Sequence, residues 1–140
     1  MVVGPVGSGK STLLKALELI QGKVQKTQNI RYTPQAIDTP GEMIQIPYLY
    51  NSFILNSSRA KAVFILANAR KYNRMPPKIA LALKSPAYGI VSQIDNADAD
   101  GIRRAESVLL SVGLKKNFHV SSVTGEGLEE LKTFLDEISL

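Results

Sequence analysis

The sequence predicts an α/β fold in which a mostly parallel, six-stranded sheet lies between helices on both of its faces. Short apolar runs alternate along the chain with segments whose apolar residues recur at helical spacing, which is the pattern of a parallel sheet covered by helices. A glycine-rich loop stands between the first apolar run and the first helical segment. The length of 140 residues favours a single domain over residues 1–140.

Six short apolar runs are predicted as strands. They lie at residues 1–3, 30–33, 35–38, 62–67, 88–92 and 118–121. Only three residues precede Gly4, so the first strand is predicted to be shorter than the usual length of about five or six residues. The sequence leaves open whether the native start lies earlier or the strand lacks its lower end.

Five segments between these strands are predicted as helices. They lie at residues 10–20, 47–58, 77–83, 99–112 and 128–138. In the first, Leu13, Leu14, Leu17 and Ile20 recur at helical spacing and Gly22 follows as a stop. The third begins at a pair of prolines, the fourth ends before a glycine, and the last carries four apolar residues on one stripe.

The composition excludes several classes of protein. With 44% hydrophobic and 21% charged residues, the chain is neither disordered nor collagen-like nor a coiled coil. No apolar run approaches the length of about 18 to 20 residues that a membrane span needs, and the first residues show no secretory signal. We therefore expect no membrane association and a cytoplasmic location.

The excess of basic residues suits an anionic ligand but does not identify one, and a solvated surface is the preferred interpretation of the scattered charges. Lys and Arg total 17 against 12 Asp and Glu, a net charge of +5. The basic residues are scattered, without the basic helix or the aromatic and basic alternation of nucleic-acid modules. The absence of cysteine and the single histidine argue against thiolate and histidine-based metal sites.

Residues 4–11, GPVGSGKS, match the phosphate-binding motif G-x-x-x-x-G-K-[ST] in its proper place between a strand and a helix. Glycines let backbone N–H groups converge on phosphate oxygens. Lys10 is predicted to reach the β- and γ-phosphates, and the Ser11 hydroxyl to bind Mg²⁺. The alternative is a glycine-rich turn with a surface lysine. The predicted nucleotide-binding residues here are Gly4, Val6, Gly7, Ser8, Gly9, Lys10, Ser11 and Thr12.

A second candidate element, Asp38-Thr39-Pro40-Gly41, ends the third apolar run. Considered alone, this tetrapeptide is typical of a common turn. Downstream of a phosphate loop, however, Asp38 can hold Mg²⁺ through water, and the Gly41 N–H can bond a γ-phosphate and so sense its loss. We expect Asp38 to be a metal residue and Gly41 a catalytic one.

A third element, Ser92-Gln93-Ile94-Asp95, follows the fifth apolar run. The Asp95 carboxylate can accept two hydrogen bonds from the N1 and N2 donors of guanine, which adenine lacks. The alternative is that Asp95 caps the following helix, with Asn96, Asp98 and Asp100 as rival caps. Ser121 and Ser122 close the sixth strand, at the end where α/β sheets place ligands.

In this order, these elements resemble a small TRAFAC-class GTPase of Ras-like fold, with three layers and a P-loop. More narrowly, Lys26-Thr27-Gln28, the segment 37–42 and the pattern 90–95 resemble the EutP/PduV family. That family is encoded with bacterial ethanolamine and propanediol utilisation proteins, whose enzymes are housed in microcompartments. The resemblance implies binding of GTP or GDP with Mg²⁺, slow hydrolysis and a role in those catabolic systems.

Carried over residue by residue, the resemblance implies roles for three groups of residues. Lys10 and Ser11 match the phosphate and magnesium residues, and Asp38 with Gly41 the second magnesium and γ-phosphate element. Thr27 matches the switch threonine whose hydroxyl closes on Mg²⁺, with Thr33 as its rival. The stretch from Thr27 to Asp38 is short for two full strands, which predicts an abbreviated hairpin.

Three departures from the family pattern modify these expectations. Gln93 replaces the lysine whose stem packs over the base, which weakens the preference for guanine and leaves ATP open. Val6 stands where enzymes that accept a partner's arginine finger carry glycine, so a Ras-type activator is not expected. Glu42 stands where many of them have the glutamine that orients water, which predicts slow hydrolysis.

Three functions remain in competition. The first is a GTP-binding switch or slow GTPase in which Lys10, Gly41 and Glu42 are catalytic. The second is an ATP-dependent phosphotransferase of the acetate kinase type. The third is a non-catalytic module that binds nucleotide to shape a surface for a microcompartment shell or catabolic enzyme, with the segment 43–50 as that surface or, preferably, as core.

Overall fold

We analysed a computed structural model of the chain, which describes residues 1–5, 7–17, 31–32, 37–71, 75–114 and 116–138. For residues 31, 32, 37, 38 and 42 the description covers the backbone alone. Within these ranges, no helix combines the length and the apolar character needed to cross a membrane.

The sheet has six strands in the order β2-β3-β1-β4-β5-β6. Only the β2–β3 pair is antiparallel, so the predicted mostly parallel sheet is confirmed. Within the described residues, β2 and β3 have two residues each and pair antiparallel, in agreement with the predicted abbreviated hairpin, and residues 33–36 between them lie outside the described part of the chain. The strands are β1 (Val2–Val3), β2 (Arg31–Tyr32), β3 (Ile37–Asp38), β4 (Val63–Asn68), β5 (Ala87–Ser92) and β6 (Asn117–His119).

The first strand is as short as expected, but it is anchored beyond its own two residues. The Phe64 N–H donates to the Met1 carbonyl at 2.8 Å, which extends the ladder between β1 and β4. The Met1 ammonium donates to the Ala62 carbonyl at 2.8 Å, and burial lowers the pKa of this amino group to about 6. These contacts lie at the amino end of the sheet.

The helices are α1 (Lys10–Ala16), α2 (Tyr50–Ser57), α3 (Ala99–Val112) and α4 (Leu128–Ile138), with 3-10 turns η1 (Gly41–Ile44), η2 (Pro47–Leu49), η3 (Ile79–Ala82) and η4 (Ile94–Asn96). The predicted bounds of α3 and α4 are confirmed. The α3 helix has a side-chain cap at one end, and at the other it stops at Gly113, whose φ of 109° continues the chain in the left-handed region.

Three helix predictions and one strand prediction need correction. The first helix ends at Ala16, and residues 18–20 of the predicted span lie outside the described residues. The predicted helix 47–58 is divided into η2 and α2. The predicted helix 77–83 is only the turn η3, because two prolines withhold N–H donors and Lys78 is left-handed at φ 61°. The sixth strand ends at His119: the Val120 N–H still donates to the Val91 carbonyl of β5 at 2.9 Å, but the Ser121 N–H bonds the Glu126 carbonyl instead of a neighbouring strand.

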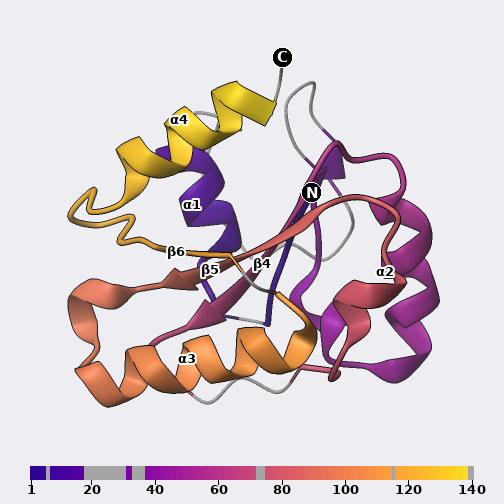
Figure 1. The fold of residues 1–140 in the computed structure, drawn as a ribbon, viewed down its shortest axis with the longest axis horizontal. Helices are drawn as coiled ribbons and strands as arrows, with labels where there is room; N and C mark the ends of the chain where they lie inside the picture. Colours follow the sequence, from indigo (N-terminus) through magenta and orange to yellow (C-terminus); the bar gives the residue numbers. More distant parts are fainter. Residues whose placement is uncertain (6, 18–30, 33–36, 72–74, 115, 139–140) are drawn as a thin grey trace.

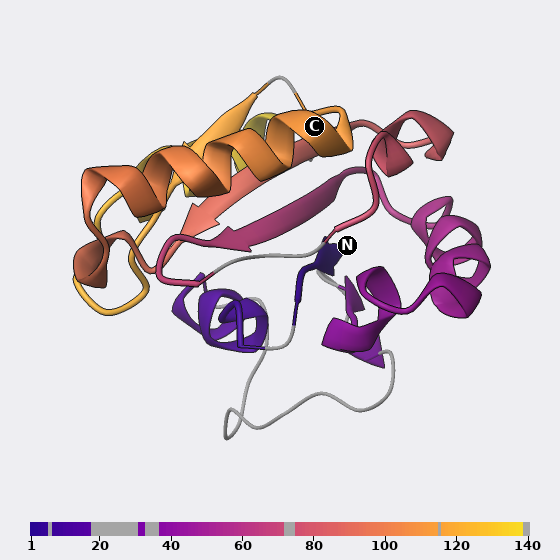
Figure 2. The same ribbon diagram turned by 90° about the horizontal axis from the view of Figure 1, so that it is seen from below.

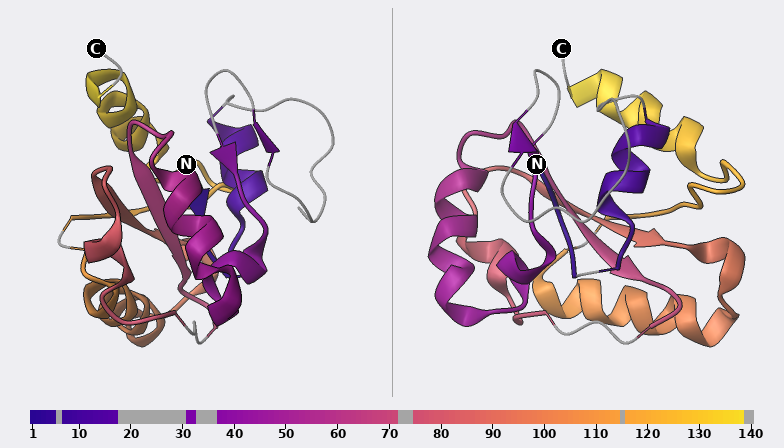
Figure 3. Two further views of the ribbon diagram at one scale, coloured as in Figure 1. Left: turned by 90° about the vertical axis from the view of Figure 1, so that its right-hand side faces the viewer. Right: turned by 180° about the vertical axis from the view of Figure 1, so that it is seen from behind.

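The sheet separates two hydrophobic clusters. Side chains of β4 alternate between them: Val63 and Ile65 face one cluster, and Phe64 and Leu66 the other. Helices α2 and α3 cover the first face, and α1 and α4 cover the second (Figures 1 and 3). Figure 2 shows the same sheet from below, with α3 across it and α1 on the other side. The three-layer arrangement is therefore the predicted one.

The segment 43–50 is divided between core and surface. Met43 and Ile44 are buried in the cluster under α2 and α3, as preferred from the sequence. Tyr48, in contrast, is 80% exposed, so the prediction of core is wrong for that residue. An exposed tyrosine is compatible with a surface role.

Candidate functional site

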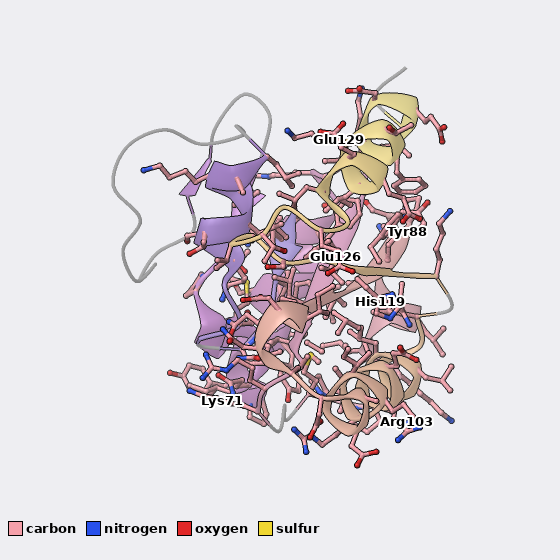
Figure 4. All side chains as sticks on the ribbon, turned by 90° about the vertical axis from the view of Figure 1, so that its left-hand side faces the viewer. Lys71, Tyr88, Arg103, His119, Glu126 and Glu129 are labelled. Carbon is pink, nitrogen blue, oxygen red and sulfur yellow. The ribbon has the colours of Figure 1, made fainter. Side chains whose placement is uncertain are left out.

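The predicted binding elements meet at one edge of the sheet. Strands β1, β4, β5 and β6 are parallel and adjacent, so the segments after their carboxyl ends lie side by side. Figure 4 looks onto this edge, with Glu126 on the loop between β6 and α4 and Lys71 on the segment after β4. The motif-bearing loops identified from the sequence all start here.

Two carbonyl groups of the phosphate loop bind the ammonium of the loop's own lysine. Gly7 and Gly9 have φ values of 82° and 88°, a conformation that favours glycine. The buried Lys10 Nζ donates to the carbonyls of Gly4 at 2.9 Å and Pro5 at 3.3 Å. Val6 lies outside the described residues. The lysine ammonium is thus held by the same loop whose N–H groups would surround a phosphate.

Ser11 and Thr12 occupy the first turn of α1. The Ser11 side chain is buried beside the loop, whereas Thr12 is exposed. Ser11 therefore lies where a hydroxyl could serve a metal bound to phosphate. Thr12 can contribute to the site through its backbone.

Side chains from the ends of β4 and β5 hold the phosphate loop by its carbonyls. Asn68 Nδ2 and Gln93 Nε2 both donate to the Gly7 carbonyl, at 3.1 and 3.0 Å. Ser92 Oγ donates to the Ser8 carbonyl at 2.7 Å. Three donors from two strands therefore restrain one short stretch of the loop, and a restrained loop loses less entropy when a ligand orders it.

Asn68 was not among the predicted site residues. Its side chain is buried, and its Oδ1 accepts a hydrogen bond from the Arg70 N–H at 2.8 Å while its amide donates to Gly7. The signal that could have found it is a polar residue placed directly after the apolar run 62–67. Such a residue falls at the carboxyl end of a buried strand, where ligands bind.

Asp95 does not cap the next helix, because another residue does. The Gly101 N–H donates to Asp98 Oδ1 at 2.7 Å, so Asp98 is the cap of α3 and the capping alternative for Asp95 is wrong. Asp95 Oδ1 instead accepts a hydrogen bond from Ser121 Oγ at 2.8 Å. The Asp95 carboxylate is exposed and oriented by a residue from the next strand end.

Ser121 is itself fixed by the loop that it begins. Its side chain is buried, and its Oγ accepts a hydrogen bond from the Thr124 N–H at 3.1 Å. Its backbone bonds the Glu126 carbonyl and the Gly125 N–H, each at 2.9 Å. Ser122 is half-buried. Of the two predicted serines, Ser121 is the one with a defined contact to Asp95.

The segment 38–41 lies beside the start of the phosphate loop. Strand β3 pairs with β1 in the register Val2 to Asp38, and the buried Thr39 Oγ1 donates to the Val2 carbonyl at 2.8 Å. Gly41 begins the turn η1 and is buried. This pairing brings the backbone of the predicted metal and γ-phosphate element next to the residues that precede Gly4.

The remaining predicted residues are three that could contact the metal or the γ-phosphate. Thr27 lies outside the described residues, and of Asp38 and Glu42 only the backbone is described. Among the described residues, no group of three or more His, Cys, Asp or Glu side chains could hold a metal ion. A buried serine hydroxyl with few carboxylates fits Mg²⁺, which takes most of its ligands from phosphate and water, and fits Zn²⁺ or Ca²⁺ poorly.

A model of the family described as "Ethanolamine utilisation - propanediol utilisation" (PduV-EutP) matches residues 1–137. The chain belongs to this family. It is 30% identical over 137 residues to the "Propanediol utilization protein PduV" of Citrobacter freundii, covering 97% of this chain and 91% of that one. It is 26% identical over 141 residues to the "Probable acetate kinase EutP" of Escherichia coli K12, covering 98% and 88%.

Solved structures with the same fold are GTPase domains of low sequence identity. The translation elongation factor SelB of Methanococcus maripaludis, in complex with a GTP analogue, has a TM-score of 0.71 at 20% identity, covering 98% of this chain. This chain spans only 32% of that longer protein. The FeoB G-domain of Methanococcus jannaschii has a TM-score of 0.65 at 18% identity, covering 98% and 94%. The Ras-like α/β fold of this family member is thereby confirmed.

Proposed function

We propose that the protein binds GDP and GTP together with Mg²⁺ and hydrolyses GTP slowly. The observation that carries this proposal is the hydrogen bond from Ser121 to Asp95, beside a phosphate loop that Ser92 and Gln93 hold. A phosphate loop alone serves any nucleotide. A carboxylate aimed by a neighbouring strand end adds a means of selecting the base.

The phosphates would bind to the loop 4–9 and to Lys10. The N–H groups of Gly4, Gly7, Ser8 and Gly9, with Val6 and the turn at Thr12, would surround the phosphate oxygens. Lys10, whose Nζ donates to the Gly4 and Pro5 carbonyls, has three N–H donors and would also pair with the β- and γ-phosphates.

Guanine would bind at Asp95. The carboxylate accepts from the N1–H and the N2 amine, and Ser121 keeps one of its oxygens oriented. Adenine has no N1–H and no N2 amine, so it cannot satisfy this carboxylate. Gln93 supplies its amide to Gly7 and would leave the face of the base less covered than a lysine stem would, while Ser122 would line the base side of the loop.

Magnesium would be held by Ser11, Thr27 and Asp38, the last of these through water. When bound, the ion neutralises charge on the phosphate oxygens. Gly41 would donate its N–H to the γ-phosphate, and Glu42 would accept a hydrogen bond from the attacking water. A carboxylate at that position would place negative charge near the γ-phosphate, and a valine in place of glycine at position 6 would leave less room for an activating arginine, so hydrolysis should be slow.

Release of inorganic phosphate from GTP and from ATP, each with Mg²⁺, tests this proposal. We expect slow multiple-turnover release from GTP and less from ATP, with both abolished in Lys10→Met. Phosphate release that is faster from ATP than from GTP would overturn the guanine assignment. Release that persists in Lys10→Met would indicate a contaminating enzyme rather than this site.

A second candidate is transfer of phosphate from ATP to acetate. It is favoured by the name "Probable acetate kinase EutP" of relatives that match 98% of this chain, and by the neutral Gln93 in the segment that faces the base. Acetyl phosphate formed from ATP and acetate, and absent with Lys10→Met, would establish this activity. Without it, the acetate kinase hypothesis fails.

Membership of the family links the protein to ethanolamine or propanediol utilisation. We propose that it acts in the cytoplasm, at the microcompartment or its enzymes.

A third candidate function is a purely non-catalytic module. Such a module would use the exposed Tyr48 side of the segment 43–50 as its partner surface. Multiple-turnover phosphate release would exclude that version.

A further inference from the structure

Asn68 carries a buried side-chain amide that binds backbone groups at both of its ends. Its Oδ1 accepts a hydrogen bond from the Arg70 N–H at 2.8 Å, and its Nδ2 donates to the Gly7 carbonyl of the phosphate loop at 3.1 Å. Because a backbone N–H holds the amide oxygen, the amide nitrogen must face Gly7. The direction of this donor is therefore fixed by the protein itself, before any ligand binds.

The backbone next to Asn68 is held by two neighbouring elements. The Ala69 N–H donates to the Ser92 carbonyl, at the end of β5, at 3.0 Å. The first turn of α3 also lies so close that a Cβ on Gly101 would come within 2.3 Å of the Ala69 carbonyl oxygen. Asn68 thus projects from a well-supported segment, which suits a residue that has to hold another group in place.

The hydrogen bond from Asn68 is connected to the lysine of the phosphate loop through one peptide unit. The Gly7 carbonyl and the Ser8 N–H belong to the same trans peptide, so they point in opposite directions. The Ser8 N–H donates to the Pro5 carbonyl at 3.1 Å, and that carbonyl also accepts from Lys10 Nζ at 3.3 Å. A continuous series of hydrogen bonds therefore joins Asn68 to Lys10, and the members of such a series strengthen one another.

We infer that Asn68 is a positioning residue for phosphate binding: through the Gly7–Ser8 peptide it fixes the turn 5–8 and, with it, the Lys10 ammonium. This role requires no movement, since the bond from Asn68 occupies a carbonyl and leaves the donors of the loop to the phosphates. The inference rests on the proposed function. Because all nucleotides share these phosphates, Asn68 supports affinity without selecting the base.

Titration calorimetry with Mg²⁺–GDP and Mg²⁺–ADP tests this role. Asn68→Asp keeps the shape of the side chain and the acceptor for Arg70, but it removes the donor and adds a negative charge. It should weaken both nucleotides by the same factor, about tenfold or more. Asn68→Ala adds no charge, and Gln93 still donates to the Gly7 carbonyl, so the loss should be about fivefold for each nucleotide. Unchanged affinities in Asn68→Ala, or a loss confined to one nucleotide, would overturn the inference.

Asn56→Asp is the matched control. Asn56 Nδ2 also donates to a backbone carbonyl, that of Ser52 at 2.8 Å, but it lies in α2, a helix that contributes no residue to the site. The variant makes the same change of charge and loses the same kind of hydrogen bond. Its affinities for GDP and ADP should equal those of the wild type. Equal losses in Asn56→Asp and Asn68→Asp would indicate general destabilisation and would overturn the inference.

Amide hydrogen exchange without nucleotide separates this inference from the proposed function. In Asn68→Ala, the Ser8 N–H should exchange about tenfold faster than in the wild type, while exchange in α4 stays the same. Unchanged exchange at Ser8 would overturn the inference. Failure of the wild-type protein to bind any nucleotide would refute the proposed function instead, and exchange at Ser8 would still decide whether Asn68 holds the loop.

Discussion

The phosphate loop and the proposed base-reading region, which comprises Asp95 and Ser121, are built in different ways. The loop is one continuous segment, residues 4–11, whose geometry comes from its own glycines and from a lysine that contacts its own carbonyls. The base-reading region joins two loops, because Asp95 is oriented by Ser121, 26 positions away in the chain. A consecutive motif can be recognised from sequence, whereas an assembled site depends on the fold that unites its parts.

The two regions also differ in what they can distinguish. In the proposed function, every nucleoside diphosphate would present the same phosphates to Lys10, but only guanine would offer the two donors that the Asp95 carboxylate can accept. Damage to the phosphate loop should therefore weaken all nucleotides alike. Damage to the base-reading region should weaken guanine nucleotides and leave adenine nucleotides unchanged.

The largest effect should follow from Lys10→Met. Loss of the ammonium should weaken GDP and ADP by about 100-fold or more, since charge-assisted bonds to phosphate are lost. The melting temperature should stay within a few degrees of wild type, because the retained stem keeps the packing beside the loop. Titration calorimetry and thermal melting measure the two quantities. Weaker binding of only GDP or only ADP would show that the phosphate loop also takes part in selecting the base.

Asp95→Asn should change the preferred base from guanine to xanthine. The asparagine amide has one acceptor and one donor group, which conflicts with the N2 amine of guanine and matches the C2 carbonyl of xanthine. GDP should weaken about 100-fold, xanthosine diphosphate should strengthen, and ADP should not change. Competition binding with the three diphosphates measures this. Unchanged GDP affinity would remove Asp95 from the site.

Gly127→Ala should destabilise the loop between β6 and α4, which carries Ser121. Gly125→Ala, in the same loop, is its matched control. Both glycines have positive φ, 79° and 85°. A Cβ on Gly127 would collide with the His119 carbonyl, whereas one on Gly125 meets nothing within 4 Å. We expect a loss of about 2 to 4 kcal/mol of stability for Gly127→Ala, and about 1 kcal/mol for Gly125→Ala. Denaturant unfolding tests this, and similar losses for the two variants would refute it.

Ser121→Ala should have the smallest effect. It removes the hydrogen bond that orients Asp95 but leaves the Asp95 carboxylate itself. GDP should weaken about five- to tenfold and ADP should not change. Ser122→Ala, at the half-buried neighbour, should stay close to wild type in GDP affinity. Calorimetry on both variants checks this. A larger loss of GDP affinity in Ser122→Ala than in Ser121→Ala would show that Ser121 is not the residue that orients Asp95.

The same contrast explains how much could be predicted from the sequence. The mostly parallel sheet, the layers and the bounds of α3 and α4 follow from local apolar patterns, and the phosphate loop from a consecutive motif, whereas the strand order comes from the structure. The hydrogen bonds from Asn68 to Gly7 and from Ser121 to Asp95 could not be derived, because each joins segments after two different strands that lie far apart in the chain. The competition between Asp95 and Asp98 for the helix cap could likewise be decided only from the geometry.

Short elements were the other weakness of sequence reasoning. The predicted helix 77–83 is reduced to a 3-10 turn by two prolines and the left-handed Lys78, and its apolar pattern carries no sign of the backbone at Lys78. The sixth strand ends early for a similar reason, since Ser121 turns away to bond Glu126. Periodicity reports which side chains are buried, but it does not report where the backbone stops pairing.

The most direct test of the central claim is a calorimetric titration of the wild-type protein with GDP and then with ADP, each with Mg²⁺. The structure places a carboxylate, oriented by a second strand end, beside a phosphate loop. We therefore expect GDP to bind at least about tenfold more tightly than ADP. Equal affinities, or tighter binding of ADP, would contradict the guanine assignment and favour the ATP-dependent phosphotransferase.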